Sequence, residues 1–167
     1  MPSPVQSIIR AATRGRGGKL NIMTFPTHER YESNLCVTGH NFYSVAVADY
    51  TKPGWDVDYA QIPENYTLIR DINEIPLALD IDIVLSQNKY GQFEIARNIA
   101  NRYSCPIISL EHTCPPNADL SPELMAGAAA MIQSFYQKKG DMNIFISEWS
   151  RKEWGWKDGE GDVIHHG

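Results

Sequence analysis

Short apolar runs alternate with helix-length amphipathic segments from Leu20 onward, and this alternation constrains the fold more than any other feature of the sequence. The runs are rich in β-branched residues and predict strands at 20–25, 42–48, 81–86, 106–110, 142–146 and 162–165. They are apolar almost throughout, which is typical of strands covered on both faces of a parallel sheet. The segment 51–65 is too rich in turn residues to assign, and a short strand is expected after it at 66–69.

Four helices are expected between these strands. They span 28–37, 90–103 and 147–154, and a further helix begins at Ser121 and ends near Gly140. In the second, apolar residues three or four positions apart form one buried face. Ser121 and Ser147 are capping residues in type and position. Repeated strand-then-helix units predict an α/β fold, a doubly wound, Rossmann-like three-layer α/β/α sandwich around a mainly parallel sheet.

The length of 167 residues suits one folded domain, assigned here to residues 20–167. Residues 1–19 hold Arg10, Arg14, Arg16 and Lys19 with no acid, and their glycines favour a flexible basic arm. The arm is either a solvated tail or a segment that binds nucleic acid or phosphate. The net charge of −5 argues against general nucleic-acid binding by the rest of the chain.

The three cysteines, Cys36, Cys105 and Cys114, form no C-x-x-C pair and indicate a reducing compartment. Neither a membrane-spanning run nor a secretory signal is recognisable, so the expected location is the cytoplasm. Cysteines and histidines of the C-terminal half match no usual zinc spacing. The sequence therefore predicts no metal site and no cofactor.

In an open parallel sheet, ligands bind beyond the carboxyl ends of the strands. The residues that directly follow the expected strands are polar and form the candidate site: Thr27, His28, Asn88, Lys89, Glu111, His112, Ser147 and Glu148. His112 is the candidate catalytic residue, because its imidazole could act as a base or hydrogen-bond donor toward a substrate hydroxyl. The alternative is a structural histidine that binds loop backbone.

The other candidates also have ordinary alternatives. His28 could simply begin a solvated helix, and Lys89 could be a surface lysine rather than the partner of an anionic ligand. The phosphate-binding patterns G-x-G-x-x-G and G-x-x-x-x-G-K-[ST] do not occur in the sequence. This disfavours a nicotinamide dehydrogenase or a P-loop enzyme.

Three segments in the same order resemble the N-terminal domain of retaining GT-B glycosyltransferases of the family 4 type. They are Pro-Ile-Ile-Ser-Leu-Glu-His at 106–112, Asn-Ile-Phe-Ile-Ser-Glu-Trp-Ser-Arg-Lys-Glu-Trp-Gly at 143–155, and Asp-Val-Ile-His-His-Gly at 162–167. The opening segment 20–32 is also similar to short glycosyltransferase-like proteins of tailed phages.

This resemblance implies that His112 lies on the acceptor side of a cleft and that the helix after Ser147 lines the cleft wall. It also places the loop 26–30 near the donor phosphates, although this loop lacks the glycine pair of the family. The family's second domain, which holds the nucleotide-sugar pocket, would begin after Gly167. The resemblance therefore implies an acceptor-binding half that transfers sugar only with a second, donor-binding domain or subunit.

Two alternatives remain open at this stage. The chain could be a non-catalytic carbohydrate-binding or assembly module, possible as a homo-oligomer or a phage component in the host cytoplasm. It could also be a small flavodoxin-like or response-regulator-like domain, although an acidic cluster after the first strand is missing.

Overall fold

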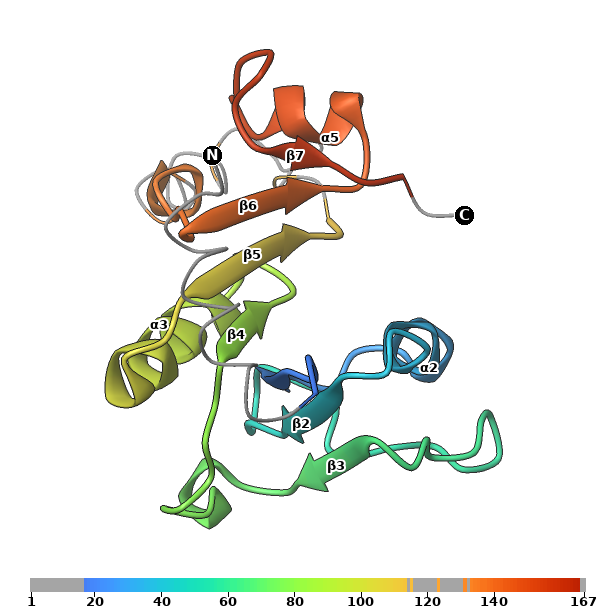
Figure 1. Cartoon of the computed structure of the whole chain (residues 1–167). Coiled ribbons are helices and arrows are strands. Elements are labelled where there is room, and N and C mark those ends of the chain that lie inside the picture. The colour runs from blue at the N-terminus through green and yellow to red at the C-terminus, as the bar shows by residue number, and fades with distance from the viewer. Residues whose placement is uncertain (1–16, 114, 116–122, 124–130, 132, 166–167) are drawn as a thin grey trace.

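The computed structural model describes residues 17–113, 115, 123, 131 and 133–165. Within this part of the chain, seven strands form one sheet in the order β3-β2-β1-β4-β5-β6-β7, and every neighbouring pair is parallel (Figure 1). The strands are β1 (Asn21–Thr24), β2 (Asn41–Val45), β3 (Tyr66–Ile69), β4 (Ile83–Ser86), β5 (Ile107–Glu111), β6 (Met142–Phe145) and β7 (Asp162–Val163). The predicted α/β, Rossmann-like fold is confirmed.

The helices α2 (Glu29–Cys36), α3 (Gln92–Tyr103) and α5 (Glu148–Glu153) lie close to their expected positions. A short 3-10 helix, η2 (Ile72–Glu74), was not expected. His28 caps α2 and Ser147 caps α5, each through a side-chain atom that accepts a backbone N–H. The helix expected from Ser121 lies largely outside the described residues, but residues 133–136 near its end are helical. Of the basic arm expected at 1–19, residues 1–16 lie outside the described residues.

The two faces of the sheet are covered differently. On one face, Phe93 and Ile99 of α3 pack with Met23, Val84 and Ile107 in the larger apolar core. On the other face, α2 packs against a second cluster: Leu20, Ile22, Phe42, Ile83 and Leu85, with the half-buried Ile108 and Leu110 beside it. Successive residues of β4 and β5 thus alternate between the two cores, and α2 and α3 lie on opposite sides of the sheet (Figure 1).

The strand order places the switch point between β1 and β4. After β1 the chain moves outward to β2 and β3, then returns beside β1 as β4 and continues in the opposite direction. The loops that leave β1 and β4 therefore diverge, and this divergence opens a crevice at the carboxyl ends of the strands. Among the described residues, no helix combines the length and the hydrophobicity that a membrane-spanning helix requires.

Candidate functional site

A cavity of about 420 Å³ lies at this switch point. It is lined by residues from the loops after β1, β4 and β5 and from the first turn of α2: Thr27, His28, Tyr31, Gln87, Asn88, His112 and Thr113. Four of the eight residues predicted from the sequence, Thr27, His28, Asn88 and His112, therefore meet around one cavity. We call this cavity the crevice.

The rings of His112 and Tyr31, which both line the crevice, contact one another. Their ring centroids are 4.5 Å apart and the ring planes meet at 83°, an edge-to-face contact. Burial, and next the charge of Glu32, raise the pKa of the Tyr31 phenol above its ordinary value, so the hydroxyl stays protonated. Tyr31 was not among the residues predicted from the sequence, because it lies in the first turn of α2 and not directly after a strand.

The loop after β1 is fixed by Glu32 of α2, which is buried. The backbone N–H and the hydroxyl of Thr27 both donate to the Glu32 carboxylate, and so does the hydroxyl of Tyr66. Burial raises the pKa of Glu32, while these donors act in the opposite direction. Thr27 thus lines the crevice, but its backbone N–H already donates to Glu32 and is not available to a ligand.

The loop after β4 is tied to the end of β1 by Gln87. Its amide nitrogen donates to the Thr24 hydroxyl at 2.7 Å and to the Phe25 carbonyl at 3.2 Å. The side-chain oxygen of Asn88 accepts the N–H of Tyr90 at 2.9 Å. These bonds hold Asn88 at the crevice wall beside the switch point.

Lys89 and Glu111 are only 1% and 0% exposed, so they lie behind the crevice rather than in its lining. The Lys89 ammonium donates to the carbonyl of Lys138 and lies within 5.8 Å of three aromatic ring centres. The Glu111 carboxylate accepts the Thr113 hydroxyl at 2.6 Å and the Thr113 N–H at 3.2 Å, and it attracts the Lys89 ammonium. Glu111 therefore joins the loops after β4 and β5.

Burial shifts the pKa of both buried groups toward neutral pH. It raises the pKa of the Glu111 carboxyl to about 7, although the Thr113 donors and the Lys89 charge act in the opposite direction. It lowers the pKa of the Lys89 ammonium to about 8, against the attraction of Glu111.

Ser147 and Glu148 lie apart from the other candidates. The Ser147 hydroxyl accepts the N–H of Ser150 at 3.0 Å and so caps α5, while Glu148 pairs with Arg151. Neither residue is in the crevice lining. They follow β6, which is separated from the switch point by β4 and β5.

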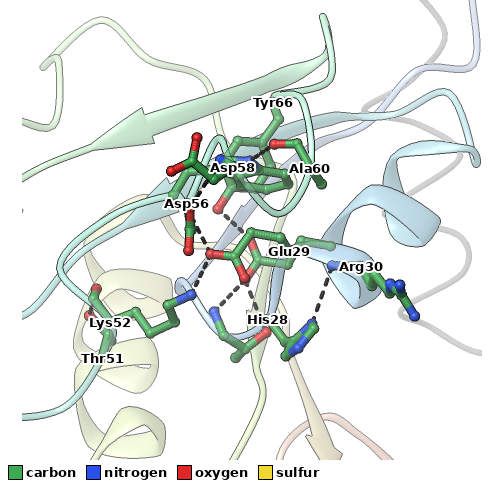
Figure 2. Close-up of polar contacts among 12 residues, drawn as sticks. His28, Glu29, Arg30, Thr51, Lys52, Asp56, Asp58, Ala60 and Tyr66 are labelled. Carbon is green, nitrogen blue, oxygen red and sulfur yellow. Dashed lines mark hydrogen bonds and ion pairs between the residues drawn. The ribbon is translucent and has the colours of Figure 1, made fainter.

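Figure 2 shows how the N-terminus of α2 is occupied by the chain's own carboxylate. The buried Glu29 pairs with the Lys52 ammonium and accepts the N–H of Asp56 at 2.9 Å. Burial alone would raise the pKa of Glu29, but Lys52, the Asp56 N–H and the N–H of Glu29 itself together outweigh it and hold the pKa at about 2. An ionised carboxylate therefore already supplies the negative charge that a helix N-terminus favours.

The crevice is lined by residues with hydrogen-bonding side chains, although most of the surface that they expose to the cavity is apolar. Among the described residues that line it, none is Asp, Glu, Lys or Arg. Hydroxyl, amide and imidazole groups can donate and accept hydrogen bonds, and Tyr31 adds an aromatic ring. No group of three or more His, Cys, Asp or Glu side chains in the described part of the chain is placed to hold a metal ion.

Comparison with known proteins gives no family model that matches the chain and no curated protein that matches it.

Proposed function

We propose that the crevice binds a sugar acceptor and that the chain is the acceptor-binding half of a GT-B-type glycosyltransferase. The observation that carries this proposal is the convergence of His112 with Thr27, His28 and Asn88 on one cavity at the switch point, whose described lining holds no Asp, Glu, Lys or Arg. Carbohydrates present hydroxyl groups and no charge, so hydroxyl, amide and imidazole side chains match them. The resemblance of segments 106–112 and 143–155 to retaining glycosyltransferases supports the same function.

In this proposal His112 orients the acceptor hydroxyl. A neutral imidazole can accept a hydrogen bond from that hydroxyl, and the contact with Tyr31 limits rotation of the ring. Asn88 and Thr27 bind neighbouring hydroxyls. Glu111, the last residue of β5, accepts the N–H and the hydroxyl of Thr113. These bonds fix the backbone on both sides of His112.

The donor diphosphate is assigned to a second domain or subunit. The α2 N-terminus, where a phosphate could bind backbone N–H groups, has Glu29 and Glu32 buried in its first turn. The Thr27 N–H donates to Glu32 and the Arg30 N–H to His28. Both the charge and the occupied donors oppose diphosphate binding at this helix.

A specific observation favours the non-catalytic alternative, a carbohydrate-binding module. A catalytic histidine is commonly oriented or assisted by a carboxylate, but the carboxylate next to His112 in sequence, Glu111, is directed into the core. Within the described residues, the crevice lining holds no acid that could serve in its place.

Binding measurements test the proposal. Calorimetry with a panel of neutral mono- and disaccharides and with UDP- and GDP-sugars should detect a neutral sugar. We expect His112→Ala to weaken that sugar at least tenfold and Ser147→Ala, which changes a remote candidate, to leave it unchanged. Absence of sugar binding, or equal binding by His112→Ala, would contradict the proposal.

A second measurement separates the two functions. The chain is mixed with a nucleotide sugar, the bound acceptor and a donor-binding partner domain, and product is followed by mass spectrometry. Transfer that His112→Ala abolishes supports the enzyme, whereas sugar binding without transfer supports the module.

A further inference from the structure

Tyr31 lines a second cavity as well as the crevice. This cavity, of about 390 Å³, lies between α2 and the sheet face that α2 only partly covers. Its lining consists of Tyr31, Asn34, Leu35 and Thr38 from α2 and the segment after it, with Leu85, Ile108, Leu110, Ile144, Ile164 and His165 from β4, β5, β6 and the segment after β7. We call it the apolar groove.

The topology explains why the groove is open. The link between β3 and β4, which contains the 3-10 helix η2, packs on the opposite face of the sheet, where Ile75 and Ile81 belong to the larger core. Helix α3 packs on the same face as this link, with Met23 and Ile107. Side chains of β4, β5 and β6 that point toward the α2 side therefore lack a covering helix from the described crossovers.

The lining of the groove is mainly aliphatic. Leu85 is buried, Ile108, Leu110 and Ile144 are half-buried, and Ile164 is 58% exposed. Of the described lining residues, none is Asp, Glu, Lys or Arg. Such a surface favours an apolar ligand.

We propose that the crevice and the apolar groove bind the two ends of one amphiphilic acceptor. Its uncharged, hydroxyl-bearing head lies against His112 in the crevice, and a single alkyl chain lies in the groove. The inference rests on the proposed function and names the acceptor class, an uncharged glycolipid or glycosylated long-chain alcohol. Each cavity falls within the range of roughly 300–1,000 Å³ typical of small-molecule sites.

Continuity through Tyr31 argues for one ligand rather than two. The Tyr31 ring contacts His112 on the crevice side, and the same side chain lines the groove beside Leu35 and Leu110. Tyrosine has an apolar body and a polar tip, so it suits the junction between a polar head and an alkyl chain.

A chain-length series tests the inference. Methyl, butyl, hexyl and octyl β-glucosides are titrated below their critical micelle concentrations and followed by calorimetry. Each methylene that enters the groove should raise the affinity about fourfold, the ratio that corresponds to about 0.8 kcal/mol. Affinity that does not change with chain length would overturn the inference, whether the groove is empty or covered by another part of the protein.

Two matched variants locate the effect. Ile164→Asn alters the groove, and Ile62→Asn alters an isoleucine of similar exposure, 45%, that is not in the groove lining. We expect Ile164→Asn to weaken octyl glucoside about fourfold or more and to leave methyl glucoside unchanged, while Ile62→Asn changes neither. Equal chain-length dependence in both variants would overturn the inference.

The role of the head group separates this inference from the proposed function. His112→Ala should weaken methyl and octyl glucosides by the same factor if the head lies in the crevice. If chain-length dependence persists but His112→Ala has no effect, both the two-ended ligand and the proposed function are contradicted. If His112→Ala weakens all glucosides and chain length has no effect, only the two-ended ligand is contradicted.

Discussion

The imidazole of His112 meets the ring of Tyr31 edge to face, with centroids 4.5 Å apart. Tyr31 belongs to α2 and His112 follows β5, so this contact joins two walls of the crevice that are 81 positions apart in sequence. Aromatic pairs in this geometry contribute about 0.5–1.5 kcal/mol beyond their burial. The contact gives the candidate catalytic ring a defined orientation.

The first prediction concerns that contact. Tyr31→Ala should lower the free energy of unfolding by about 1–3 kcal/mol, because ring burial and the aromatic pair are both lost. It should also weaken sugar binding. Tyr31→Phe keeps the ring and should retain most of both properties, as measured by urea unfolding and calorimetry. Equal damage by the two substitutions would show that the hydroxyl, rather than the ring contact, matters.

The second prediction concerns the buried carboxyl of Glu111. Its pKa of about 7 in the folded protein is above the ordinary 4.5, so the folded state holds its proton more tightly. As pH rises from 4.5 to 7, this group reduces the free energy of unfolding, by at most about 3 kcal/mol. Relative to wild type, Glu111→Gln should therefore gain stability over this pH range. A difference between the two proteins that is constant with pH would contradict the assignment.

The third prediction concerns Glu29 and has the opposite sign. Its folded-state pKa of about 2 lies below 4.5, so its stabilisation is complete above pH 4.5 and is lost as pH falls through about 2. Glu29→Gln should cost about 1–2 kcal/mol at pH 7, a modest value because Lys52 is 42% exposed. Urea unfolding at pH 7 and at pH 2.5 should show the difference shrinking at the lower pH.

The fourth prediction separates capping from ligand binding at Ser147. Because its hydroxyl caps α5, Ser147→Ala should lower the free energy of unfolding by about 1 kcal/mol. Sugar affinity should not change, since Ser147 is outside the crevice lining. Ser147→Asp restores a capping acceptor and should recover the stability. A loss of affinity in Ser147→Ala would instead place this residue in the ligand site, as the sequence resemblance implies.

Most of the fold could be predicted from the sequence because strands and helices have different local periods. The strand at Tyr66–Ile69 agrees with its prediction residue for residue, and the others agree within a few residues. The strand expected at 42–48 stops at Val45, and soon afterward Asp49 adopts a left-handed backbone with φ of 69°. Such a turn depends on tertiary packing, which the spacing of apolar residues along the sequence does not indicate.

The apolar runs also predicted strands covered on both faces, and here the structure differs in part. Ile108, Leu110 and Ile144 face the groove and are only half-buried. The cause is that both the β3–β4 link and α3 pack on the opposite face, where Ile75 and Phe93 belong to the larger core. The apolar character of a run does not show which face of its strand the connections between other strands will cover.

The meeting of several candidate residues around one cavity could be predicted from the sequence. Thr27, Asn88 and His112 directly follow strands that are neighbours at the switch point, so the topology brings them together. Glu111 shares the buried face of β5 with Ser109, so it points into the core while His112 borders the crevice. The side on which a residue leaves a strand, and the contribution of Tyr31 from α2, depend on the folded structure.

NMR mapping of the residues that contact the sugar tests most directly the claim that the crevice binds it. In an amide NMR titration with the neutral sugar that binds, we predict that the largest shifts occur at Thr27, Asn88 and His112, and that His112→Ala abolishes the shifts at the other two. Shifts confined to residues outside the crevice, or shifts at Thr27 and Asn88 that His112→Ala leaves intact, would contradict the account.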